Sequence, residues 1–322
     1  MEETKLCYDD VLLKPKKTGV ESLSNVDTST ELAGITLEAP MISAPMDTVT
    51  ERRMAEEIAE QGGIGVVHRF LEPSEQAEMV EGISPVAGAV GLNEYSRCKE
   101  LVDAGVDMLV ADIAHGHHEA FMDYIEDITE AYDVPVAAGN VATVEGAYDL
   151  SKSGADIVKI GVGPGAACTT REMTGAGYPQ FSAVKEISEQ NLDADLIADG
   201  GIRKPGDLCK ALMAGADAVM CGGVFGDTYE SPKDGEFRGM STKAAAEDRS
   251  DRDLKESDSY EEGEVMFYEE NNCVEDVIQE YLGGLRSGLS YCGANNVTDA
   301  RDKSEFVRVT GSTQYRNGAH GN

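Results

Sequence analysis

The chain has 322 residues, of which 41% are hydrophobic, so it is long enough for one α/β barrel with a large core. It carries 60 acidic residues against 27 Lys and Arg, a net charge of −33, and this balance argues against a basic surface for nucleic acids. The acidic residues are spread along the chain, which favours a hydrated, halophilic surface over a binding site for a strongly cationic partner.

The first segment, residues 1–40, precedes any strand pattern. Its beginning, MEETKLCYDD, lacks the apolar stretch of a signal peptide, and no run in the chain is long enough to span a membrane. Seven cysteines without CxxC pairs fit a reducing compartment better than a disulfide framework or a structural zinc site. We therefore expect a cytoplasmic protein without membrane contact.

Short apolar runs of strand type then alternate with helical patterns. The runs are residues 41–45, 63–68, 86–91, 108–114, 134–139, 157–163, 195–201 and 218–223. Runs that are apolar on both faces indicate a parallel sheet covered by helices. The repeats AGVD, SGAD and AGAD, at 104–107, 153–156 and 214–217, each place a glycine where a helix ends before a strand. Eight such units predict a closed TIM (β/α)₈ barrel, with residues 1–322 forming one domain.

Residues 227–272 follow the eighth strand and are polar, charged and without a clear pattern. Composition alone fits a disordered surface loop as well as an active-site lid. Loops after barrel strands build the catalytic face, so a lid over the barrel mouth is the second interpretation, and both stay open at this point.

The loop GVGPGAACTTR, residues 161–171, follows the sixth strand and ends near Cys168. Its glycines allow close backbone approach to a ligand, and a thiolate at the catalytic face would be a good nucleophile. A buried, inert cysteine beside a structural turn is the alternative.

Glycine pairs end the seventh and eighth strands, at ADGGI (198–202) and CGGVF (221–225). These are the two strand ends where barrels commonly bind phosphate through backbone amides, and Asp199 could hold ribose hydroxyls. The cluster DIAHGHH, with Asp112, His115, His117 and His118, suggests a metal site. No further histidine completes a ligand set, so we expect Asp112 to meet a cofactor amide or ribose.

Together these motifs resemble the IMP dehydrogenase/GMP reductase family over nearly the whole chain. The motifs are CYDDVLLKP, SAPMDTVTE, GGIGVVHR, AGNVAT, GVGPGAACTTR, ADGGI, GGLRSGLSYCGA and FVRVTG, in family order. The resemblance implies a homotetrameric barrel with a mobile lid, a nicotinamide cofactor, and a potassium ion held by carbonyls of the cysteine loop. It also implies that Cys168 attacks C2 of the purine.

Site roles carried over from the family fall into three groups. The implied nucleotide-binding residues are Ser43, Asp199, Gly200, Gly201, Gly222, Gly223, Gly239, Met240, Ser241 and Gly263. The implied cofactor-binding residues are Arg69, Asp112, Val162, Gly163, Ser287 and Ser290. The implied potassium ligands are the backbone carbonyls of Gly163, Gly165 and Cys168.

Within the family, several features resemble the reductase. Residues 62–91 run on without the regulatory insert of most dehydrogenases, and CTTREMTGAGYPQ and FRGMST resemble reductase motifs. The dehydrogenase lid carries an adjacent Arg-Tyr pair that activates water, whereas Arg249, Arg252 and Tyr260 are not adjacent here. The reductase instead uses a threonine and a lid glutamate, which map to Thr170 and Glu262.

Other features resemble the dehydrogenase, namely the N-terminal half, AHGHH and SYCGA. Ser259 and Leu23 also stand where reductases carry arginines. We expect reduction of GMP to IMP with NADPH and release of ammonia through a covalent Cys168 intermediate. The alternatives are oxidation of IMP to XMP with NAD, and a non-catalytic regulator that binds purine nucleotides.

Overall fold

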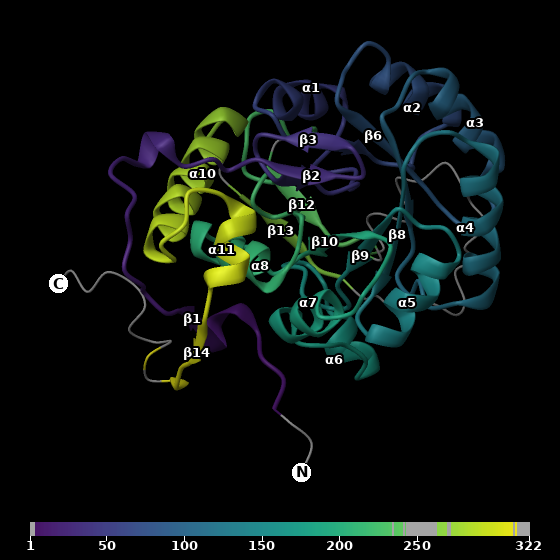
Figure 1. Cartoon of the computed structure of the whole chain (residues 1–322). Coiled ribbons are helices and arrows are strands. Elements are labelled where there is room, and N and C mark those ends of the chain that lie inside the picture. The colour runs from purple at the N-terminus through teal and green to yellow at the C-terminus, as the bar shows by residue number, and fades with distance from the viewer. Residues whose placement is uncertain are drawn as a thin grey trace.

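The protein forms a closed barrel of eight parallel strands (Figure 1). The computed structural model describes residues 4–233, 235–240, 242, 263–268, 272–311 and 313. The barrel strands are β4 (Met41–Ser43), β5 (Ile64–Val67), β6 (Val86–Val90), β7 (Met108–Asp112), β8 (Val136–Val141), β9 (Ile157–Ile160), β10 (Asp195–Asp199) and β11 (Ala218–Cys221). Each strand overlaps one of the eight apolar runs, so the predicted barrel is confirmed. The ring closes where β11 pairs with β4, with Val219 opposite Met41.

Helices surround the barrel between successive strands (Figure 1). They are α1 (Arg52–Glu60), α2 (Pro73–Val80), α3 (Tyr95–Asp103), α4 (Glu119–Ala131), α5 (Val144–Lys152), α6 (Thr170–Thr174), α7 (Gln180–Ser188), α8 (Pro205–Ala214), α10 (Val274–Tyr291) and α11 (Val297–Lys303). Glycines at the three predicted helix ends, Gly105, Gly154 and Gly215, have φ of +90°, +95° and +117°. Only α2 and its short connections lie between β5 and β6, so no inserted domain stands there.

Two apolar layers hold these elements together. One fills the barrel with side chains such as Ile42, Val66 and Met220, and the other lies between strands and helices. The hairpin of β2 (Thr30–Leu32) and β3 (Ile35–Leu37) joins the inner layer through Leu32 and Leu37. The Ala33 amide donates to Asp195 at the start of β10 at 2.6 Å, so the hairpin covers the amino ends of the strands.

Two further strand pairs lie outside the barrel. β1 (Val11–Leu13) pairs with β14 (Phe306–Arg308), which brings the two ends of the described chain together (Figure 1). β12 (Glu236–Arg238) pairs with β13 (Val265–Phe267) inside the predicted lid segment. The carboxyl ends of the barrel strands remain open between these additions, and the candidate site lies there.

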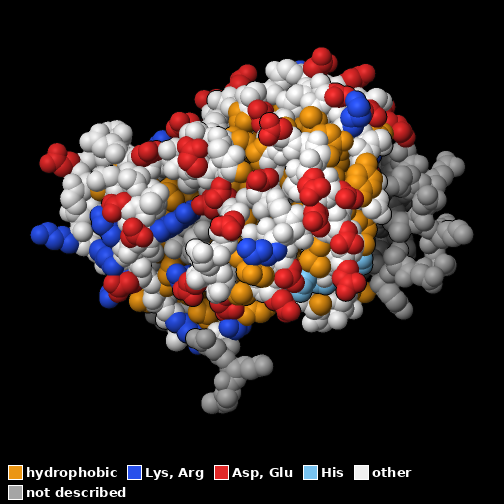
Figure 2. Space-filling model, turned by 45° about the vertical axis from the view of Figure 1, so that its right-hand side comes forward, with side chains coloured by type: hydrophobic (Ala, Val, Ile, Leu, Met, Phe, Trp, Pro, Cys, Tyr) orange, Lys and Arg blue, Asp and Glu red, His pale blue; other side chains and the backbone are white. Residues whose placement is uncertain are grey.

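Acidic side chains are scattered over the face drawn in Figure 2, between Lys and Arg groups that gather mainly on its left. This distribution agrees with acidic residues that are spread along the sequence. Among the described helices, none is both long enough and apolar enough to cross a bilayer.

Candidate active site

A cavity of about 770 Å³ opens at the carboxyl ends of the barrel strands. Fourteen of the residues predicted from the sequence line it: Arg69, Asp112, Val162, Gly163, Gly165, Cys168, Thr170, Asp199, Gly200, Gly201, Gly222, Gly223, Gly239 and Met240. Twelve of them end or follow the barrel strands β5, β7, β9, β10 and β11, whose carboxyl ends the closed barrel brings together, and Gly239 and Met240 follow β12. This size falls in the usual range for small-molecule sites, about 300–1,000 Å³.

The loop between β9 and α6 carries the candidate nucleophile. The Cys168 thiol donates to the Thr170 hydroxyl over a distance of 3.2 Å, and the Cys168 amide donates to the Gly165 carbonyl at 3.1 Å. Gly163 has φ of +83°, a left-handed conformation that lets the loop turn tightly behind the cysteine. On the other side, the Glu264 amide donates to the Ala167 carbonyl at 3.0 Å, so the segment before β13 lies against the cysteine.

Glycines at the ends of β10 and β11 form a second part of the site. Gly200 and Gly201 are both left-handed, with φ of +83° and +80°. A Cβ on Gly222 would stand 2.9 Å from the Met46 sulfur, so a side chain there would crowd the loop. The two strands are neighbours in the barrel, and bare backbone amides at such adjoining ends can hold a phosphate.

A buried lysine joins the two aspartates of the site, and sequence reasoning missed it. The Lys159 amine lies 2.6 Å from the Asp199 carboxylate and 2.8 Å from the Asp112 carboxylate. Burial alone would lower the pKa of Lys159, but the charges of Asp112 and Asp199 outweigh it and hold that pKa above its usual value. A single lysine inside the apolar strand IVKI was the signal that could have revealed this group.

Asn140 forms a second hydrogen bond to the Asp199 carboxylate. Its side-chain amide donates to Asp199 at 2.9 Å and to the Gly161 carbonyl at 2.7 Å. The backbone leaves no room beside Gly161, since a Cβ there would stand 2.2 Å from the Asp199 carbonyl oxygen. Asn140 and Lys159 thus both bond the Asp199 carboxylate, and Gly161 packs against the Asp199 backbone.

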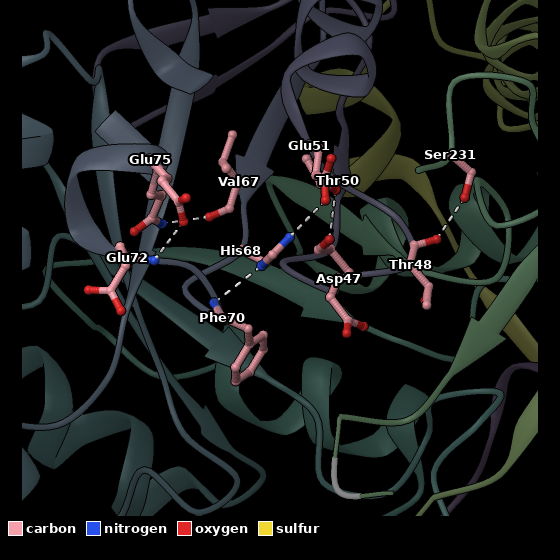
Figure 3. Close-up of polar contacts among 12 residues, drawn as sticks. Asp47, Thr48, Thr50, Glu51, Val67, His68, Phe70, Glu72, Glu75 and Ser231 are labelled. Carbon is pink, nitrogen blue, oxygen red and sulfur yellow. Dashed lines mark hydrogen bonds and ion pairs between the residues drawn. The ribbon is translucent and has the colours of Figure 1, made fainter. Parts of the chain in front are cut away.

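Arg69 lines the cavity at the end of β5, where its guanidinium lies 4.9 Å from the centre of the Phe70 ring. Figure 3 shows how the preceding residue is held. His68 is buried, its Nδ1 accepts from the Phe70 amide at 3.2 Å, and its Nε2 lies 3.5 Å from the Glu51 carboxylate. The imidazole thus joins the β5 loop to the start of α1 and orients the segment that carries Arg69.

The described part of the predicted lid is anchored to the loop between β4 and α1. Arg238 on β12 forms an ion pair with Asp47, and both side chains are buried. The Ser231 hydroxyl donates to the Thr48 carbonyl at 2.7 Å (Figure 3). Residues 234, 241, 243–262 and 269–271 lie outside the described part of the chain. The mobility of the lid, and the roles of Glu262 and Ser241, stay predictions.

Four predicted residues do not line this cavity. Ser43 is buried and accepts a hydrogen bond from Thr50 at 2.8 Å, and Gly263 lies behind the cavity wall against Gly239. Ser287 donates to the Gly283 carbonyl within α10, and Ser290 lies one turn further along that helix. In the histidine cluster, His117 Nε2 lies 2.9 Å from Asp149 on α5. None of these contacts assigns a ligand to these residues.

Comparison with known proteins places this site among nucleotide enzymes. A family model described as IMP dehydrogenase / GMP reductase domain matches residues 5–320. The inosine-5′-monophosphate dehydrogenase of Nitrosopumilus maritimus is 31% identical, over 95% of this chain and 96% of its own length. The GMP reductase of Leishmania donovani is 30% identical, over 98% of this chain and 96% of its own length.

A solved structure gives the same result. The crystal structure of a GMP reductase variant from Trypanosoma brucei in complex with guanosine 5′-monophosphate superimposes with a TM-score of 0.93 and 27% sequence identity. The match covers 100% of this chain and 98% of that chain. The chain therefore belongs to the IMP dehydrogenase/GMP reductase family of NAD(P)-dependent oxidoreductases that act on purine nucleotides.

Proposed function

We propose that this enzyme is an NADPH-dependent GMP reductase, which converts GMP to IMP and releases ammonia. The observation that carries the proposal is the Cys168–Thr170 pair, whose sulfur and hydroxyl oxygen lie 3.2 Å apart at the cavity. A hydroxyl beside the nucleophile suits the departure of an amine, because it can pass a proton to the leaving nitrogen.

The nucleotide would bind with its phosphate at the glycine loops after β10 and β11 and its ribose at Asp199. This placement brings the purine toward Cys168, which lines the same cavity. A substrate of this kind appears in the related structure, which contains guanosine 5′-monophosphate. A purine monophosphate is anionic, and the cavity offers it backbone amides together with Arg203, whose guanidinium also pairs with Asp9 at 2.6 Å.

The chemistry then requires three events at C2 of the purine. The Cys168 sulfur adds to C2, and its proton passes to the ring. The exocyclic nitrogen takes a proton through Thr170 and Glu262, the C2–N bond breaks, and ammonia leaves. When bound, NADPH supplies a hydride to C2. The C2–S bond then breaks and the proton held on the ring returns to the sulfur, so the atoms and electrons of GMP, NADPH and a proton balance with IMP, ammonia and NADP.

Residues on the β5 and β7 side of the cavity fit a nicotinamide cofactor. Arg69 after β5 and Asp112 at the end of β7 line this part of the cavity, together with Val162 of the loop after β9. Arg69 lies 4.0 Å from the Glu94 carboxylate and offers a cation to a diphosphate. The neighbouring cysteine loop fits a potassium ion, since it offers backbone carbonyls, and a carbonyl oxygen such as that of Gly165 has two lone pairs. We assign the ion to the carbonyls of Gly163, Gly165 and Cys168. We also assign a homotetramer and a cytoplasmic location, which light scattering and cell fractionation test.

The rival activity is oxidation of IMP to XMP with NAD, and relatives with that name are as similar as the reductases. Against it, residues 240–263 contain no adjacent Arg-Tyr pair that would activate water. A regulator without catalysis is the other alternative. The nucleophile and its threonine argue against this reading, because simple nucleotide binding needs neither.

One assay separates these activities. Purified protein in high potassium chloride is incubated with GMP or IMP and with each of NADPH, NADH, NADP and NAD, while absorbance at the nicotinamide band and free ammonia are followed. We expect GMP-dependent oxidation of NADPH with one ammonia per turnover. Formation of XMP from IMP, with GMP left unchanged, would show that the enzyme is a dehydrogenase. Nucleotide binding without any turnover would show a regulator.

A further inference from the structure

Lys159 occupies an unusual position for a charged side chain. It is 1% exposed, and its single amine bonds carboxylates that end two different barrel strands, β7 and β10. Asp112 and Asp199 both line the candidate cavity. The two bonded carboxylate oxygens are therefore no more than two hydrogen-bond lengths apart, with one positive charge between them.

We propose that Lys159 is a positioning residue that couples nucleotide binding to cofactor binding. The inference rests on the proposed function, because that function assigns Asp199 to the ribose and Asp112 to the cofactor. The two carboxylates share one counter-ion, so a ligand that fixes either of them also fixes the amine and orients the other. The first ligand then bears the loss of conformational entropy when these side chains become ordered, so the second ligand binds more tightly.

The contacts also predict which side depends more on the lysine. Asp199 keeps a second donor, the Asn140 amide at 2.9 Å. The polar partner of Asp112 among the described residues is Lys159. Loss of the amine would therefore leave Asp199 oriented and Asp112 free to turn, while the two carboxylates repel each other. The affinity for cofactor falls more than the affinity for nucleotide.

The test measures GMP binding calorimetrically with and without saturating NADP, a pair that cannot react in the proposed direction. In the unmodified enzyme we expect NADP to tighten GMP binding by about 5–150-fold, the usual range for coupled sites. We call the GMP affinity with NADP divided by the GMP affinity without it the coupling ratio. In Lys159→Met the coupling ratio falls close to one, and the KM for NADPH rises by a larger factor than the KM for GMP. Lys159→Arg keeps the charge and restores part of the coupling.

A matched control is Lys210→Met, which removes another buried lysine. The Lys210 amine donates to the Tyr8 carbonyl at 2.8 Å, and neither residue lines the cavity. Its coupling ratio stays at the value of the unmodified enzyme. If Lys159→Met does not fold, Asp112→Asn removes the charge at one end of the bridge and must lower the ratio in the same way.

Two results would overturn the inference. One is an unmodified enzyme whose GMP affinity is indifferent to NADP, and the other is a ratio that survives in Lys159→Met or Asp112→Asn. Failure of the proposed function has a different signature, because GMP then fails to support NADPH oxidation by the unmodified enzyme. In that case the same binding ratio is measured with IMP and NADPH, so the inference about Lys159 is still tested.

Discussion

Arg238→Met removes the cation that ties the β12–β13 ribbon to the barrel. Arg238 is 2% exposed, it donates from Nε to Asp47 at 3.4 Å and also from Nη2, and its Nη1 lies 3.0 Å from Glu236. Methionine fills a similar space without charge. The substitution therefore leaves the Asp47 carboxylate charged and 6% exposed, without its ion-pair partner.

The expected size of the effect follows from which charge is left unpaired. Removal of one partner of a buried ion pair lowers the free energy of unfolding by about 3–5 kcal/mol, and this is our expectation for Arg238→Met. Asp47→Ala leaves Arg238 next to Glu236, so we expect a smaller loss of about 1.5–3 kcal/mol, the range for a hydrogen bond to a charged group. Lys185→Met breaks the exposed pair between Lys185 on α7 and Glu189 just after it, for which about 0–1 kcal/mol is typical.

Urea unfolding at one fixed high salt concentration, followed by circular dichroism and extrapolated to zero urea, measures all three variants. The double variant with Asp47→Ala and Arg238→Met completes a double-mutant cycle. We expect its loss of unfolding free energy to be smaller than the sum of the two single losses. The reasoning fails if Arg238→Met loses less stability than Asp47→Ala, or no more than Lys185→Met.

Three further predictions concern catalysis and solvent. Cys168→Ala should abolish turnover while calorimetry still detects GMP binding, and turnover in that variant would contradict covalent catalysis. Glu262→Gln should lower kcat by about 10²–10⁴, the range for a general acid–base group, with a smaller change in the KM for GMP; an unchanged kcat would remove Glu262 from the mechanism. Because the net charge is −33, multimolar potassium chloride should raise the melting temperature by screening repulsion, and an identical melting temperature at low salt would refute this.

The barrel could be predicted because its signals are local. Each strand overlaps an apolar run, and glycines such as Gly105 and Gly215 end helices in the left-handed conformation that their repeats indicate. The three small strand pairs could not be predicted. Each strand has three residues, too few for an alternating pattern, and β1 pairs with β14 from the other end of the chain. Such pairing depends on where the barrel places the segments, which no local pattern contains.

The residues of the candidate site also fall into those that the sequence could predict and those that it could not. Cys168 and the glycine pairs follow directly from their places after strands, because a parallel barrel brings these ends to one face. Lys159 lies in the middle of an apolar run, and its aspartates belong to strands elsewhere in the chain. Ser287 and Ser290 were assigned through family resemblance alone, and their helix, α10, sends Val277, Glu280 and Tyr281 to the cavity instead.

The pairing of β11 with β4 has a consequence for how the protein is made. The strand that closes the ring ends at Cys221, so a chain still on the ribosome carries β4 with one edge unpaired until more than two thirds of it has been synthesised. An unpaired strand edge can pair with the same edge of a neighbouring chain. The acidic residues are spread along the sequence, so nascent chains on one polysome repel each other during this interval. We therefore expect the net charge of −33 to keep unfinished copies of the chain apart.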